Sequence, residues 1–224
     1  MKHKEFILTP LSSLIEQTLQ PMDLYKGQIC NYIMKEYVLQ SLFIKLTGCM
    51  EQKAKCILWD IATHDFEYRR IFLRDNSNQG EYSTYDSKNM VYKTLINQGE
   101  KFCQTRKKEL LNYLIDFKEQ ILTKSILKVW LPRELQDLKI KSLFASQRWA
   151  EEHLFNSPLK EIYEALHRYR NRCAHNVLSY QGNVMSPQKI KEKENANYAT
   201  WFTLLVLMDM IYMELYEKFA IKCS

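Results

Sequence analysis

Residues 33–46 read IMKEYVLQSLFIKL, and this stretch decides the fold class. Its apolar side chains cover nearly the whole circumference of a helix, a pattern that is typical of a helix buried at the centre of a domain. The stretch lies within residues 23–73, which we expect to form a long helical segment that Gly48 bends or interrupts. We expect the second half of this segment to present Cys49, Lys53 and Asp60 on a mixed surface.

The remainder of the chain favours helices as well. It holds only five Gly and five Pro residues, which leaves few of the turn signals that a many-stranded sandwich or barrel needs. A single all-α helical bundle over residues 1–224 is therefore the predicted architecture. Further helices are expected after a Thr9-Pro10 start, at 91–128, at 132–155, from Pro158 onward and at 197–219, with polar loops at 74–89 and 179–195.

The last of these helices is strongly apolar, since residues 201–213 contain only Thr203 and Asp209 as polar residues. Such a stretch is shorter than the roughly 20 residues that cross a bilayer, and it carries an acid inside. A core or dimer helix therefore fits better than a membrane helix. Asp209 needs a partner there, and Arg170, a residue across a dimer axis or a wet helix end would each serve.

Composition excludes a largely disordered chain, because 46% of the residues are hydrophobic. The net charge of +6 is compatible with a polyanionic partner but does not demand one. Six cysteines without a C-x-x-C pair, and an N-terminus without an apolar leader, predict free thiols in a reducing cytoplasm. Neither cysteine nor histidine spacing selects a metal, so no metal or cofactor is expected.

Charge and chemistry concentrate near the end of the helix that begins around Pro158. Residues on one face of that helix fall at spacings of three and four, namely Leu159, Ile162, Leu166, Arg170 and Cys173. A guanidinium cannot lose its charge, so Arg170 on this packed face needs an anion, a carboxylate or a wet cleft beside it. Arg168 points elsewhere and can pair with Glu164 on the surface.

The nearest histidine follows Arg170 by five residues. On an unbroken helix, His175 lies about 7.5 Å further along the axis and about 140° round it. The two side chains therefore converge on one substrate atom only if the helix ends near Ala174, or if a two-fold dimer brings Arg170 of one subunit to His175 of another.

The residues Arg170-Asn171-Arg172-Cys173-Ala174-His175 resemble the R-x4-6-H signature of HEPN domains. The position of the motif, late in a helical chain and before an apolar last helix, is similar too. The resemblance implies a helical bundle that usually forms a homodimer. It also implies a metal-independent endoribonuclease of toxin, antiphage-defence or RNA-processing systems, with RNA as substrate and an antitoxin or a sensor protein as a further partner.

The resemblance assigns roles to particular residues. His175 would act as general acid or base and Arg170 would stabilise the phosphoryl oxygens in the transition state. Asn171 would orient phosphate or ribose, and the RNA phosphates would contact Arg168, Arg172 and Lys160. Residues 48–53 look like the helix of related domains that places an acid opposite the motif, so that Glu51 is a candidate partner for Arg170. The alternative for Glu51 is a surface pair with Lys55.

Competing interpretations remain at this level. Some HEPN toxins carry a tyrosine two residues after the histidine, where this chain has Val177, and this disfavours the nucleotidylated branch. The alternative to the catalytic interpretation is that His175 is a helix C-terminal residue and Arg170 a structural ion-pair partner. A non-catalytic HEPN-like module that binds RNA or protein, and a scaffold that dimerises through Trp201 and its neighbours, are the rival functions. Cys173 is better explained by packing than as a nucleophile.

Overall fold

The structure is a computed structural model that describes residues 3–25, 32–74, 82–99, 106–148, 153–175 and 197–223. Within these ranges every regular element is a helix, which confirms the predicted all-α class. In chain order the elements are α1 (His3–Ile7), α2 (Leu11–Leu19), η1 (Gln20–Tyr25), α3 (Tyr32–His64), α4 (Phe66–Arg74), α5 (Tyr85–Gln98), α6 (Lys107–Phe117), η4 (Lys118–Leu122), α7 (Leu127–Trp130), α8 (Pro132–Asp137), α9 (Ile140–Leu143), α10 (Ser157–His175) and α12 (Tyr198–Lys222).

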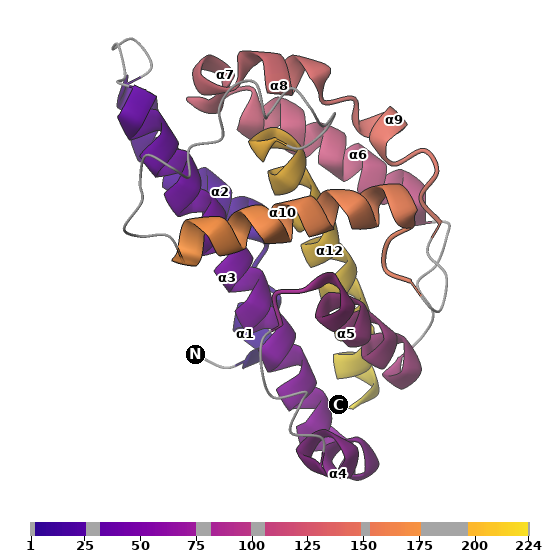
Figure 1. The fold of residues 1–224 in the computed structure, drawn as a ribbon. Coiled ribbons are helices and arrows are strands. Elements are labelled where there is room, and N and C mark those ends of the chain that lie inside the picture. The colour runs from indigo at the N-terminus through magenta and orange to yellow at the C-terminus, as the bar shows by residue number, and fades with distance from the viewer. Residues whose placement is uncertain are drawn as a thin grey trace.

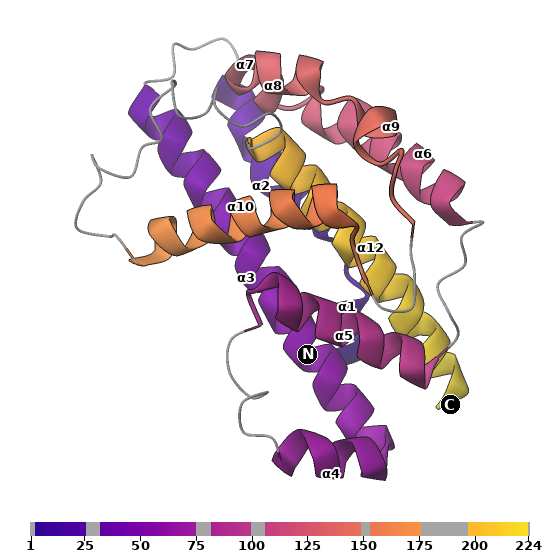
Figure 2. The same cartoon turned by 45° about the vertical axis from the view of Figure 1, so that its right-hand side comes forward.

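Two long helices, α3 and α12, form the centre of the bundle (Figure 1). α12 packs against α3, α5, α6, α10 and α2. α10 crosses both long helices, as the two ribbon views agree, while α6 to α9 group along one side of α12 (Figure 2). α4 lies at the far end of α3. This arrangement brings the helix that carries the motif directly onto the two most buried helices.

The central position of α12 follows from its sequence. Most of its side chains are buried, and those proposed for a dimer face, Trp201, Phe202, Leu205 and Met208, are at most 3% exposed inside one chain. The dimerising scaffold built on that face is therefore wrong. By length and composition alone α12 is the one helix in the described ranges that would reach across a membrane, yet 83% of its most apolar window is buried in the protein.

α3 runs without a break through Gly48, contrary to the predicted bend. A single helical glycine costs only about 1 kcal/mol relative to alanine, which the packing of α3 offsets. The break comes instead at Asp65, whose carboxylate accepts a hydrogen bond from the Tyr68 backbone N–H at 2.9 Å and caps α4. That bond, with one from Gln98, lowers the pKa of the Asp65 carboxyl.

Other predicted boundaries also shift. Thr84 caps α5 by accepting from Ser87 N–H, so this helix begins inside the predicted loop at 74–89. In place of the predicted helix at 91–128 the structure has α5, α6 and η4. In place of the one at 132–155 it has two short helices, α8 and α9. The predicted loop at 179–195 lies outside the described residues.

Asp209 finds a partner that the sequence did not suggest. Its carboxylate lies 2.5 Å from the Nζ of Lys53, and the two side chains are only 1–2% exposed. Its second oxygen accepts the backbone N–H of Leu11 at 2.6 Å, at the start of α2. Lys53 also donates to the Thr9 carbonyl at 2.5 Å. The predicted surface position of Lys53 and the predicted Asp209 partners are therefore wrong, because α2 covers this face of α3.

Candidate functional site

The motif helix α10 is fixed where it crosses α3 and α12. Leu159, Tyr163, Leu166 and Tyr169 are buried on its inner face. The ring of Tyr169 lies 5.0 Å from that of Trp201 in α12, and its hydroxyl is 2.6 Å from the hydroxyl of Tyr198. Aromatic contacts of this kind contribute about 0.5–1.5 kcal/mol beyond burial. The residue after Tyr169, Arg170, is therefore held firmly in place.

Arg170 occupies the edge of this packed face, with 19% of its side chain exposed. Its Nη2 lies 3.3 Å from the Oε2 of Glu51 on α3, and its Nη1 donates to the Oδ1 of Asn171 at 3.0 Å. The anion that a guanidinium on an apolar stripe needs is thus a carboxylate from the central helix.

Glu51 serves two cations at once. Its Oε1 accepts from the Nζ of Lys55 at 2.9 Å while its Oε2 faces Arg170. The two sequence interpretations of Glu51, a partner for Arg170 and a surface pair with Lys55, therefore hold together. One carboxylate shared by two cations leaves this cluster with a net positive charge, which suits an anionic ligand.

A third cation lies beneath the cluster. Lys88 of α5 is 1% exposed and donates to the Met50 carbonyl of α3 at 2.8 Å. Burial lowers the pKa of the Lys88 ammonium to about 7; Glu51 opposes this shift, and the positive charges of Lys55 and Arg170 add to it. The sequence analysis missed Lys88 because it assigned this residue to a loop. The apolar spacing of Tyr92 and Leu95, extended back by one turn, would have placed it on a buried helix face.

A histidine not considered for the site joins it from the same helix. The Nε2 of His167 lies 3.3 Å from the Nδ2 of Asn171 and 3.1 Å from the Oγ of Ser83. Tyr163 donates to the Ser83 carbonyl at 2.8 Å, which holds this segment against α10. Spacings of three and four from His167 to Arg170 and Asn171 put all three on one helix face, and this was the signal available in the sequence.

His175 is the last residue of α10, and its side chain lies outside what the structure describes. Because α10 stays helical up to His175, the backbone position of His175 is about 7.5 Å along the axis and about 140° round from that of Arg170. Within one chain, the structure brings together Arg170, Asn171 and Glu51 from the predicted set.

The predicted phosphate contacts lie on the outer face of α10. Arg168 and Arg172 are exposed. Lys160 is 43% exposed, with its Nζ 3.8 Å from the Glu164 carboxylate and 5.1 Å from the centre of the Tyr85 ring. Glu164 thus pairs with Lys160 and not with Arg168, as the sequence had suggested.

Cys173 is half-buried, and burial raises the pKa of its thiol. A thiol with a raised pKa is a poor nucleophile, in agreement with the packing role. Across the described ranges, no three His, Cys, Asp or Glu side chains lie close enough together to hold a metal ion.

Known proteins do not indicate a function for this cluster. The chain matches no protein-family model, no curated protein and no solved structure. The chemistry of the cluster therefore has to be argued from its own residues.

Proposed function

We propose that this protein is a metal-independent endoribonuclease, with Arg170 and His175 as its catalytic residues. The observation that carries the proposal is the position of Arg170, which Glu51 and Asn171 hold at the crossing of α10 and α3 in a cluster with excess positive charge. A preorganised, always-charged donor fork is the group best suited to phosphoryl oxygens in a transition state. The resemblance of residues 170–175 to the HEPN signature supports the same assignment.

In this mechanism the ribose 2′-oxygen attacks the adjacent phosphorus. The bond from phosphorus to the 2′-oxygen forms, the bond to the 5′-oxygen breaks, and the products are a 2′,3′-cyclic phosphate and a 5′-hydroxyl. A base takes the proton of the 2′-hydroxyl and an acid supplies one to the leaving 5′-oxygen. Imidazole titrates near neutral pH, so His175 suits either role. Arg170 stabilises the negative charge that builds up on the non-bridging phosphoryl oxygens.

A homodimer would solve the separation of Arg170 and His175 along α10. Two-fold symmetry places the same pair of residues from each subunit at one axis, so that one cleft holds two arginines and two histidines. One histidine then acts as base and the other as acid. An RNA-cleaving toxin or antiphage effector of this kind would need an antitoxin or a sensor protein to control it.

A non-catalytic module that binds RNA or protein is the second candidate. The Glu51–Arg170 ion pair favours it, because a carboxylate already occupies the guanidinium. In the catalytic proposal the RNA phosphate has to compete with Glu51, and Lys55 provides Glu51 with an alternative partner.

The test is cleavage of mixed RNA in EDTA by the purified protein, beside Arg170→Ala and His175→Ala variants. Arg133→Ala is the matched control, because Arg133 is an exposed arginine on α8. We expect wild type and the control to produce cyclic-phosphate ends and both site variants to lose cleavage. Cleavage that survives both site changes, or that stops in EDTA, would contradict the mechanism. RNA binding without cleavage by the wild type would establish the second candidate.

A further inference from the structure

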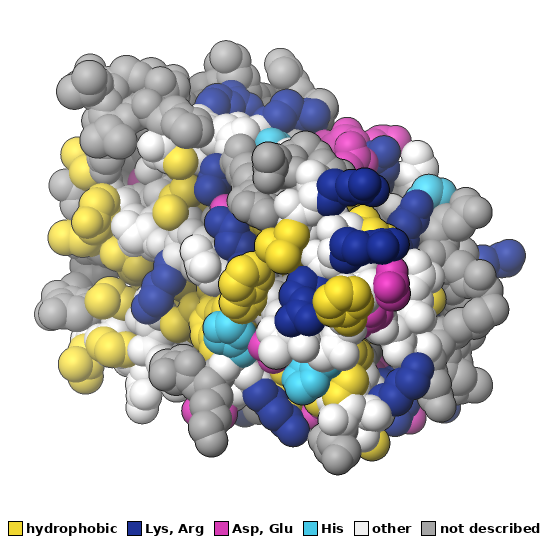
Figure 3. Space-filling view, turned by 90° about the horizontal axis from the view of Figure 1, so that it is seen from below, with side chains coloured by type: hydrophobic (Ala, Val, Ile, Leu, Met, Phe, Trp, Pro, Cys, Tyr) yellow, Lys and Arg dark blue, Asp and Glu magenta, His cyan; other side chains and the backbone are white. Residues whose placement is uncertain are grey.

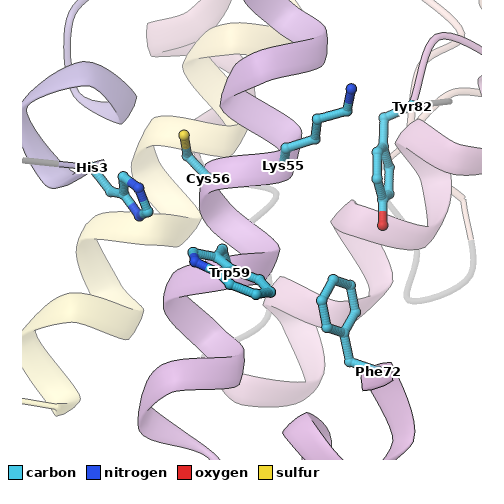
Figure 4. Close-up of a pocket in the computed structure, with 6 residues that line it drawn as sticks. All are labelled: His3, Lys55, Cys56, Trp59, Phe72 and Tyr82. Atoms are coloured by element: carbon cyan, nitrogen blue, oxygen red, sulfur yellow. The ribbon is translucent and has the colours of Figure 1, made fainter. Parts of the chain in front are cut away.

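A cavity of about 360 Å³ opens beside the Arg170 cluster, and aromatic rings line much of it. In Figure 4 the rings of Trp59, Phe72 and Tyr82 surround one opening between α3, α4 and the segment before α5, while His3 approaches from α1. The remaining lining residues are Lys55 and Cys56. The sequence analysis assigned no role to any of these aromatic residues.

The aromatic wall presents one free surface. Trp59 is 52% exposed, whereas Phe72 and Tyr82 are buried. The Phe72 ring lies 6.1 Å from the Trp59 ring at an interplanar angle of 64°, so that it supports the indole from the side. A large exposed indole next to a hollow is the arrangement that a planar base can stack on.

Lys55 connects this cavity to the Arg170 cluster. Its amine lies at the rim in Figure 4 and bonds the same Glu51 that faces Arg170. Glu51, Lys55 and Trp59 follow one another at intervals of four along α3, so that they share one face, with Trp59 about 12 Å along the axis from Glu51. A strand whose phosphate reaches Arg170 can therefore extend a neighbouring nucleotide to Trp59.

The surrounding charge has the sign that a polyanion requires. In Figure 3 Lys and Arg side chains gather on the face seen from below, the side on which α4 lies. Arg69 and Arg70 of α4 are exposed, and α4 also supplies Phe72 to the cavity. Positive charge around an aromatic platform is the usual combination in proteins that bind single-stranded nucleic acid.

We propose that the Trp59 cavity binds the unstacked base of a nucleotide next to the scissile phosphate. The substrate is then single-stranded RNA, since the bases of a duplex are not free to enter. That the neighbouring phosphate is the one cleaved rests on the proposed function of Arg170. Binding of the base itself does not depend on cleavage.

The test uses an RNA strand with 2′-O-methyl groups, which cannot be cleaved by 2′-oxygen attack, so that binding is measured alone. The full-length protein is titrated by fluorescence anisotropy beside Trp59→Ala and Trp59→Phe variants. Ile71→Ala is the matched control, because Ile71 is 60% exposed on α4 next to Phe72 but does not line the cavity. Thermal melting checks that each variant is folded, and Trp59→Phe, which keeps a ring, covers the case in which the alanine variant fails to fold.

We expect Trp59→Ala to weaken binding of the single strand about 5- to 150-fold, the equivalent of about 1–3 kcal/mol for one stacked base. Trp59→Phe should retain most of the affinity, and binding of the corresponding duplex should not depend on Trp59. Equal affinities for wild type, Trp59→Ala and Ile71→Ala would overturn the proposal. So would Trp59-dependent binding of a free nucleoside monophosphate as tight as that of the strand, which would indicate a free-nucleotide site.

The two proposals fail separately. If unmodified RNA is not cleaved but the modified strand binds through Trp59, the base site stands and the catalytic role of Arg170 does not. If RNA is cleaved through Arg170 but Trp59→Ala changes neither strand binding nor KM, the catalytic proposal stands and the base site is wrong.

Discussion

Two ion pairs, Glu51–Arg170 and Lys53–Asp209, are formed by residues only two positions apart on α3. The two pairs differ in their access to water. The side chains of the first are 13% and 19% exposed, and those of the second are 1% and 2% exposed. Residues two apart on a helix point about 200° apart, so that α3 places one pair at its edge and the other in the core. The comparison separates a pair that can meet a ligand from one that only holds helices together.

The surroundings of the two pairs explain this difference. Each oxygen of the Asp209 carboxylate accepts one hydrogen bond, Oδ1 from Lys53 and Oδ2 from the Leu11 backbone, and the side chain is 2% exposed. Burial raises the pKa of the Asp209 carboxyl, and the nearby Lys53 charge opposes that rise. Glu51 in contrast is divided between Arg170 and Lys55, and the excess charge of that cluster faces an opening.

The largest effect is expected from breaking the buried pair on one side. Asp209→Asn leaves the Lys53 ammonium buried without its counter-charge, which should lower the free energy of unfolding by about 3–5 kcal/mol. Urea unfolding measures it, with Glu217→Gln on the exposed side of α12 as control. The double variant Lys53→Met with Asp209→Leu should recover much of the loss; a double variant as unstable as Asp209→Asn would contradict this account.

Breaking the Glu51–Arg170 pair should lower the rate of RNA cleavage more than it lowers stability. Arg170→Ala is expected to lower cleavage about 100- to 1000-fold, the usual effect of removing one transition-state donor. The free energy of unfolding should change by less than it does in Asp209→Asn, because Lys55 remains as a partner for Glu51. Initial cleavage rates and urea unfolding on the same sample decide it. A loss of stability as large as that of Asp209→Asn would mean that Arg170 is a structural residue.

The lowered pKa of Lys88, beside Glu51 and Arg170, predicts a dependence of stability on pH above neutrality. Its folded pKa of about 7 lies below the ordinary lysine value, so between these pH values the unfolded chain binds the extra proton. Stability should therefore rise as pH increases from about 7 towards 10, by up to about 1.4 kcal/mol per pH unit. Below pH 7 both states are protonated and this contribution to the slope disappears.

The measurement for Lys88 is urea unfolding at several pH values, for wild type and Lys88→Met. The methionine variant keeps an unbranched chain of similar length and lacks the titrating amine, so its curve should be flatter over this range. Parallel curves for the two proteins would show that Lys88 does not titrate in the expected window.

The smallest effect is expected from Glu51→Gln, which removes the shared carboxylate but keeps the shape of the side chain. The free energy of unfolding should change by less than it does in Asp209→Asn, because the glutamine keeps the shape of the side chain and Arg170 retains its contact with Asn171. Binding of the 2′-O-methyl strand should tighten and depend more steeply on salt, because Arg170 and Lys55 are released for phosphate. Weaker binding in this variant would indicate that Glu51 aligns Arg170 more than it neutralises it.

The sequence was sufficient to predict much of the cluster around Glu51 and Arg170, but little of the surroundings of Lys53 and Asp209. The spacing of Arg170 on an apolar stripe required an anion, and the resemblance of residues 48–53 to a helix of related domains suggested Glu51. The partner of Asp209 depends on how α2 folds over α3 and α12, which no local pattern reveals. Lys88 was missed for a different reason, since the local cap at Thr84 stands amid turn-forming residues that predicted a loop.

Helix boundaries also differ in whether they depend on local sequence or on tertiary packing. The start of a helix near Pro158 was predicted from short-range signals, and α10 begins at Ser157; the predicted last helix at 197–219 is α12, which Asn197 caps. The break at Asp65 carries an equally local capping signal that was overlooked, whereas continuity through Gly48 is a consequence of tertiary packing.

The hydrogen bond from Leu11 to Asp209 joins residues 198 positions apart. The first turn of α2 therefore completes its bonding only after the chain has been made as far as Asp209 and α12 has docked. Contacts of such long range slow folding relative to a bundle built from neighbouring hairpins. During synthesis the early helices wait for α12, and a ribosome-bound fragment that stops before residue 197 has neither the central helix under α10 nor the cap on α2. A nascent chain should therefore not hold α10 in place until α12 has been made.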